Sequence, residues 1–114
     1  MAVKHQIELL ASLQDLDLMI EELGEVQKLG FEVHEEGREK LEKARAELVE
    51  KLNKPFVGRY ERLRGKYKRA IVPIRGDTCL GCFMKLPTYL ITHAQRSEQV
   101  INCEGCGRII YWLE

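Results

Sequence analysis

The sequence predicts an α+β protein in which an antiparallel helical hairpin of the coiled-coil type and a short third helix precede a small domain built on four cysteines. Two observations carry this prediction: apolar residues recur at helical spacing before residue 50, and all four cysteines of the 114-residue chain lie in its last third. We place the helices in residues 1–69 and the cysteine domain in residues 70–114. A chain this short buries one modest core, which excludes large catalytic scaffolds such as a TIM barrel.

The first helix is predicted over residues 3–29. Its apolar residues follow one another at spacings of four, three, four and three, which is the heptad seam of a coiled coil: Leu9, Leu13, Leu16, Ile20 and Leu23. Gly30 marks the turn of the hairpin, and the second helix carries its apolar residues at Leu41, Ala44 and Leu48. Because two helices alone make a thin core, we also expect some homodimer at high concentration.

Pro55 ends the second helix and opens the third, because proline lacks an N–H and is favoured in the first helical turn. The third helix is predicted to continue through Tyr67. Beyond it, the apolar residues at 71–74 predict an extended strand. The remaining elements expected of the cysteine domain are a helix over residues 87–95 and strands over residues 100–102 and 108–112.

The cysteines form two C-x2-C pairs separated by twenty residues: Cys79, Cys82, Cys103 and Cys106. Each tight turn can present two sulfur atoms to one point, so four thiolates can surround a metal ion as a tetrahedron. Three glycines suit such turns, which need a positive φ; they are Gly81, Gly105 and Gly107. Because thiolates fill all four positions, the expected ion is structural and not catalytic.

Other uses of the cysteines were weighed against this metal site. Disulfides are disfavoured because nothing marks the chain for export and the cytosol keeps thiols reduced. A thioredoxin-type redox pair belongs on a βαβ scaffold, which the sequence lacks. Iron also suits four thiolates, so it stays open as an alternative to zinc. His93 lies between the pairs as a further candidate ligand, but the four thiolates already complete the site.

The zero net charge of the chain conceals a strong asymmetry. Residues 1–50 carry a net charge of −7 and residues 51–75 carry +8. Residues 59–75, called the basic segment below, contain Arg59, Arg62, Arg64, Lys66, Lys68, Arg69 and Arg75. With Tyr60 and Tyr67 among them, these cations predict a nucleic-acid-binding surface that contacts phosphates and stacks bases. The alternative is a solvated helix whose cations face the acidic hairpin, with Tyr60 in the core.

The chain resembles the bacterial C4-type zinc-ribbon family, whose members carry an N-terminal helical hairpin. The matching residues are Leu13-Gln14-x-Leu16-Asp17, Tyr60-x2-Leu63, Val72, Gly76-x2-Cys79-x-Gly81-Cys82, Leu86-Pro87 and Cys103-x2-Cys106-Gly107-Arg108-Ile109-Ile110-Tyr111. This resemblance implies one structural Zn²⁺ per chain on Cys79, Cys82, Cys103 and Cys106. It also implies either nucleic-acid binding or an adaptor role of the type III secretion or flagellar kind. The coiled coil is much shorter than the family pattern.

We therefore expect a non-enzymatic protein with one of two roles. It binds nucleic acid through the basic segment, or it binds a protein partner through the helical hairpin. No catalytic arrangement of Ser, His and Asp at motif spacing occurs in the sequence. There is also no run of about 18 apolar residues and no signal-peptide pattern, which predicts a cytoplasmic protein with no membrane partner.

Overall fold

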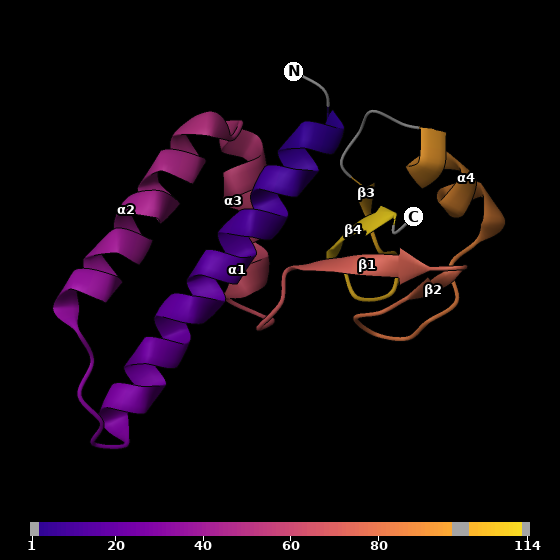
Figure 1. Cartoon of the computed structure of the whole chain (residues 1–114). Helices are drawn as coiled ribbons and strands as arrows, with labels where there is room; N and C mark the ends of the chain where they lie inside the picture. Colours follow the sequence, from indigo (N-terminus) through magenta and orange to yellow (C-terminus); the bar gives the residue numbers. More distant parts are fainter. Residues whose placement is uncertain (1–2, 97–100, 113–114) are drawn as a thin grey trace.

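The computed structural model describes residues 3–96 and 101–112 of the chain. Its elements are α1 (Val3–Lys28), α2 (Glu35–Lys51), α3 (Lys54–Arg64), β1 (Ile71–Arg75), β2 (Thr78–Cys79), α4 (Thr88–Arg96), β3 (Ile101–Asn102) and β4 (Ile109–Trp112). Helices α1 and α2 run side by side as a hairpin, and the four strands with α4 form a small unit beside α1 and α3 (Figure 1). The mixed α+β fold predicted from the sequence is confirmed. No helix among the described residues combines the length and apolar character that a membrane span requires.

The hairpin turns where the sequence predicted it. Gly30 has a φ of +96°, a left-handed conformation that glycine adopts without strain. The predicted seam of α1 is only partly right, because Leu13 is fully buried while Leu9 and Ile20 are half-buried. Helix α1 packs on α2, α3 and β1 together, so it buries a wider face than the narrow heptad seam of a two-helix coiled coil. Leu10 is therefore fully buried as well.

Helix α3 begins as predicted, with proline in its first turn, but it ends earlier than predicted. Its last residue is Arg64, and Gly65 forms the C-terminal cap by donating its N–H to the Glu61 carbonyl at 3.1 Å. Glycine costs about 1 kcal/mol in a helix interior, which favours an end at this position. Tyr67 therefore lies after the helix, in the connection that leads to β1.

The four strands form one sheet in the order β2-β1-β4-β3, in which β1 and β4 are parallel and the outer pairs are antiparallel. The two-residue β2 was not predicted from the sequence. Of the strand predicted over residues 100–102, residues 101 and 102 are confirmed as β3, whereas Val100 lies outside the described residues. Residues 88–95 of the predicted helix are confirmed in α4.

The central strands β1 and β4 separate two hydrophobic cores. The helical core consists of Leu10, Leu13, Leu52, Tyr60, Ala70, Ile71 and Ile109. The ribbon core consists of Val72, Ile74, Cys79, Leu86, Leu90, Ile101, Cys103 and Ile110. Successive side chains of a strand point to opposite faces of a sheet. Adjacent residues of β1 and β4 therefore belong to different cores, and the sheet is a wall that both cores share.

A buried glutamine joins the hairpin to this sheet. Gln14 of α1 donates from Nε2 to the Ile71 carbonyl at 3.0 Å and accepts at Oε1 from the Ile71 N–H at 2.8 Å. On the other side of β1, Ile109 donates its N–H to the Ala70 carbonyl at 2.9 Å. Strand β2 pairs with β1 only at Ile74 and Arg75. The Gln14 amide thus satisfies the edge of β1 that β2 leaves uncovered.

Candidate metal centre and basic segment

The four cysteine side chains meet at one point, and we call their Sγ atoms the thiol site. All four Sγ atoms lie within 4.8 Å of one another. The Cys79 and Cys106 sulfurs are 3.9 Å apart, and the Cys82 and Cys103 sulfurs are 3.8 Å apart. Zn–S bonds of about 2.3 Å place the corners of a tetrahedron about 3.8 Å apart. The cysteines are free, and their spacing fits a tetrahedral metal ion and no disulfide.

Two backbone turns present these sulfur atoms. In the first, Phe83 donates its N–H to the Cys79 carbonyl at 2.8 Å and adopts a left-handed φ of +62°. In the second, Gly107 donates its N–H to the Cys103 carbonyl at 2.9 Å and has a φ of +80°. The Gly105 N–H also points at the Cys103 sulfur, at 3.3 Å, where it stabilises negative charge on that atom.

Only one of the three predicted turn glycines has the positive φ that was expected. Gly107 has it, but Gly81 and Gly105 do not, so that part of the prediction is wrong. At these two glycines another side chain approaches the backbone closely. A Cβ atom at Gly81 would lie 2.6 Å from Arg108 Nη1, and one at Gly105 would lie 2.5 Å from Met84 Sδ. Arg108 therefore lies against the first cysteine turn, and Met84 lies against the second.

The electrostatics of the thiol site favour a cation. Cys79 and Cys103 are buried, and Cys82 and Cys106 are half-buried. Burial raises the pKa of the Cys79 thiol above its ordinary value, because the thiolate loses its hydration. A bound divalent ion compensates this cost and displaces the thiol protons. The site is thus built for a metal held by four thiolates. The side chain of His93 lies outside the described residues.

The basic segment does not form one continuous free surface. Arg62, Lys66, Lys68, Arg69 and Arg75 are exposed. Arg59 is half-buried and donates from Nη1 to Asn102 Oδ1 of β3 at 3.2 Å. Arg64 forms an ion pair with Glu21 of α1 and donates to the Lys68 carbonyl. Five of the seven predicted cations are thus exposed, whereas Arg64 faces the acidic hairpin as the alternative interpretation held.

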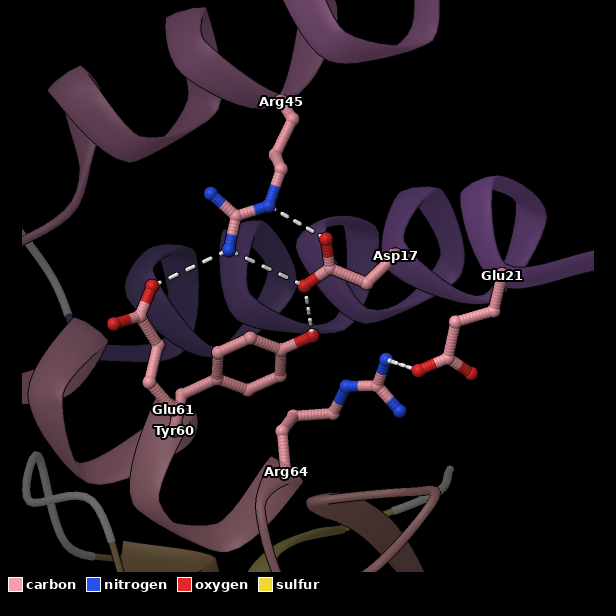
Figure 2. Close-up of polar contacts among 6 residues, drawn as sticks. All are labelled: Asp17, Glu21, Arg45, Tyr60, Glu61 and Arg64. Carbon is pink, nitrogen blue, oxygen red and sulfur yellow. Dashed lines mark hydrogen bonds and ion pairs between the residues drawn. The ribbon is translucent and has the colours of Figure 1, made fainter. Parts of the chain in front are cut away.

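Tyr60 belongs to a polar cluster between the hairpin and α3 (Figure 2). Its ring is fully buried, and its hydroxyl donates to Asp17 Oδ2 at 2.7 Å. Arg45 of α2 donates from Nε to Asp17 Oδ1 at 2.5 Å and pairs with Glu61 at 3.3 Å. Burial and the Asp17 carboxylate both raise the pKa of Tyr60. Tyr60 is therefore a core residue and cannot stack on a base, so the predicted stacking role of this ring is wrong.

Tyr67 and Arg108 connect the basic segment to the second cysteine turn, a role that the sequence did not predict. The Tyr67 hydroxyl donates to the Cys106 carbonyl at 2.7 Å. The Arg108 guanidinium carbon lies 3.8 Å from the centroid of the Tyr67 ring, and Arg108 Nε donates to the Arg69 carbonyl at 3.0 Å. The only sequence signal for Arg108 was its place directly after Cys106 and Gly107 in the motif of the resembling family.

Residues 78–110 match the family model of the C4-type zinc ribbon domain, so the fold and the thiol site define a protein that contains a C4 zinc ribbon. No curated protein matches the chain. The chain is similar to two solved structures, which it covers by about a third of their length. The CT398 protein of Chlamydia trachomatis is 31% identical with a TM-score of 0.64, over 69% of this chain and 34% of that one. The HP0958 protein of Helicobacter pylori is 32% identical with a TM-score of 0.64, over 78% of this chain and 36% of that protein.

A third solved structure, of a protein from Mycobacterium smegmatis, shares the fold alone. It is 22% identical to this chain with a TM-score of 0.55, over 69% of this chain and 34% of that protein. All three similarities extend well beyond the 33 residues of the zinc ribbon, so at least part of the helical region is shared with these proteins.

Proposed function

We propose that this chain is a non-enzymatic nucleic-acid-binding module that contacts phosphates through the exposed cations of the basic segment. The residues that would bind are Arg62, Lys66, Lys68, Arg69 and Arg75. The observation that carries the proposal is their availability. Among the described residues, none of these five forms an ion pair, while Asp17 and Glu21, which contact α3 from α1, are already paired with Arg45 and Arg64. Phosphates are the partners that exposed cations without an ion pair fit best.

In this proposal the zinc ribbon is the stable domain that lies next to the exposed cations. One Zn²⁺ held by Cys79, Cys82, Cys103 and Cys106 would supply folding energy to a domain too small to build a large core. Phe83, beside the second of these ligands, exposes 73% of its surface. An exposed aromatic ring stacks on unpaired bases, so the ligand class that we expect is single-stranded RNA or DNA. Reduced thiols require a reducing compartment, which supports action in the cytoplasm.

Charge reversal at two exposed positions tests the proposal. Arg62→Glu combined with Arg69→Glu leaves both cores untouched, so folding and zinc content should survive while binding of a single-stranded oligonucleotide is lost. Each phosphate contact removed should lower the slope of log K against log salt by about 0.7 for a single strand. The matched control, Lys28→Glu with Lys43→Glu, makes the same charge change at exposed positions of the hairpin. It should bind almost as well as the wild type.

The results separate an error in the proposed binding surface from an error in the proposed function. Intact affinity in the folded Arg62→Glu and Arg69→Glu variant would exclude this surface. Absence of measurable affinity in the wild type at low salt would exclude nucleic-acid binding itself. A stability loss in this variant alone would indicate that the cations serve to neutralise the acidic hairpin.

A second candidate function is that of an adaptor that binds a protein through the hairpin. One observation favours it: Leu29 and Phe31 at the hairpin turn expose 76% and 64% of their surfaces, at the end of the hairpin away from the sheet (Figure 1). Exposed apolar residues of this kind mark interaction sites. A protein captured by the wild type in the presence of nuclease, and lost with Leu29→Ser and Phe31→Ser, would favour the adaptor. The predicted homodimer would use the same residues.

A further inference from the structure

Residues 65–69, which lie in the connection between α3 and β1, carry three of the five exposed cations and are called the connecting segment here. It contains Lys66, Lys68 and Arg69. It is too short to have a core of its own, so contacts with its neighbours decide whether its cations hold one arrangement. Two contacts of the connecting segment lead to the second cysteine turn.

The first contact is the hydrogen bond from the Tyr67 hydroxyl to the Cys106 carbonyl, at 2.7 Å. Cys106 is a member of the thiol site, so this bond ends on the backbone of a metal-ligand residue. The Cys106 carbonyl keeps its position only while the turn from Cys103 to Gly107 is closed. Metal binding supplies the folding energy that closes such turns.

The second contact is made by Arg108, which touches both cysteine turns and the connecting segment at once. Its guanidinium stacks on the Tyr67 ring at 3.8 Å, and its Nε donates to the Arg69 carbonyl at 3.0 Å. On its other side it lies so close to Gly81 that a Cβ atom there would be 2.6 Å from Nη1. In this position Arg108 links the first cysteine turn to the connecting segment.

We infer that Tyr67 and Arg108 form a clasp through which metal loading of the thiol site fixes the connecting segment, so that zinc controls the phosphate-binding cations without contacting them. The second half of this inference rests on the proposed function. The clasp makes the two residues positioning residues: neither needs to touch the nucleic acid. Metal loss should open the second turn, release Tyr67 and Arg108, and leave the cations on a mobile connection. Binding then loses the benefit of a preorganised surface.

Amide hydrogen exchange of the full chain tests the clasp directly. Residues 65–69 should exchange more slowly in the zinc-loaded protein than after chelation. Tyr67→Phe, which keeps the ring and every charge, should raise exchange there by about fivefold to tenfold in the zinc-loaded protein, because one hydrogen bond is lost. Zinc content should stay at one ion per chain. The matched control is Tyr89→Phe, which removes a hydroxyl that is hydrogen-bonded to Glu104 of the same cysteine turn.

A pair of glycine variants gives an independent check. Gly81→Ala should displace the Arg108 side chain and raise hydrogen exchange at residues 65–69. Gly105→Ala should displace only Met84 and leave hydrogen exchange at residues 65–69 unchanged. Helix α2 serves as the internal reference in every sample, since its main packing partner is α1. Equal exchange at residues 65–69 with and without zinc would overturn the inference. So would wild-type exchange in zinc-loaded Tyr67→Phe.

Oligonucleotide binding by the same variants separates the inference from the function on which it rests. Tyr67→Phe keeps all five exposed cations, so a loss of affinity of about fivefold would come from their position and not from their number. If exchange responds as expected and the wild type binds no oligonucleotide, the proposed function fails and the clasp stands. If the wild type binds equally well with and without zinc, control of binding by zinc is refuted.

Discussion

Replacing Gln14 with methionine should cost this protein a large part of its stability. Gln14 is 4% exposed, and its amide makes both of its hydrogen bonds to the backbone of Ile71, itself 2% exposed. Methionine has a similar length but neither donor nor acceptor. It would therefore leave the Ile71 N–H and C=O buried without partners, at about 1–3 kcal/mol each. The expected loss in the free energy of unfolding is roughly 2–6 kcal/mol, against a typical total of about 5–15 kcal/mol.

The matched control is Gln27→Met, the same substitution on the same helix. Gln27 is exposed and accepts one hydrogen bond from Arg38 at 2.7 Å. Gln27→Met should therefore lower the free energy of unfolding by no more than about 0.5 kcal/mol. Urea unfolding followed by helical circular dichroism, with zinc in excess, measures both variants. A loss below about 1 kcal/mol for Gln14→Met would show that the edge of β1 does not depend on this amide. Gln14 would then not be the contact that joins the hairpin to the sheet.

Two further substitutions follow from burial. Leu13→Asp should abolish cooperative melting because Leu13 is fully buried, whereas Ile20→Asp should lower the melting temperature only slightly, since Ile20 is half-buried near Arg45 and Arg64. Equal effects in thermal melts would contradict this ranking. The raised pKa of Tyr60 gives another prediction. The Tyr60 hydroxyl keeps its proton to a higher pH in the folded state than in the unfolded chain, so the free energy of unfolding should fall as the pH rises above about 10. Tyr60→Phe should make this fall less steep in urea titrations at several pH values.

The helices were predictable because their signals are local. Apolar periodicity, Gly30 and Pro55 all act within a few residues, and each gave the correct element. The end of α3 was wrong because the apolar and aromatic pattern continues through Tyr67, while Gly65 stops the helix. Strand β2 was missed because a two-residue strand has no periodicity, and it exists only through its pairing with β1.

The thiol site was also predictable, since two short cysteine motifs carry most of its geometry. Which cations of the basic segment are exposed and which are bound to other residues could not be predicted. Arg64 meets Glu21 across 43 positions of the chain, and Tyr67 meets Cys106 across 39. No pattern in the sequence distinguishes these engaged side chains from the exposed Arg62. Gln14 is part of the family motif, but the motif does not show what this residue does. Its role follows only from its hydrogen bonds with Ile71, which lies 57 positions further along the chain.

The position of the basic segment follows from the way the two cores share the sheet. The part of the segment from Tyr60 to Val72 runs from the helical core to the ribbon core, so this part is anchored at both ends. Ile71 and Ile109 pack on the helices, while Val72 and Ile110 pack towards the thiol site. A chain held at both ends loses little further entropy when it binds a ligand. On the proposed function, the cations between Tyr60 and Val72 would gain affinity from this anchoring, and disruption of either core should then weaken phosphate binding.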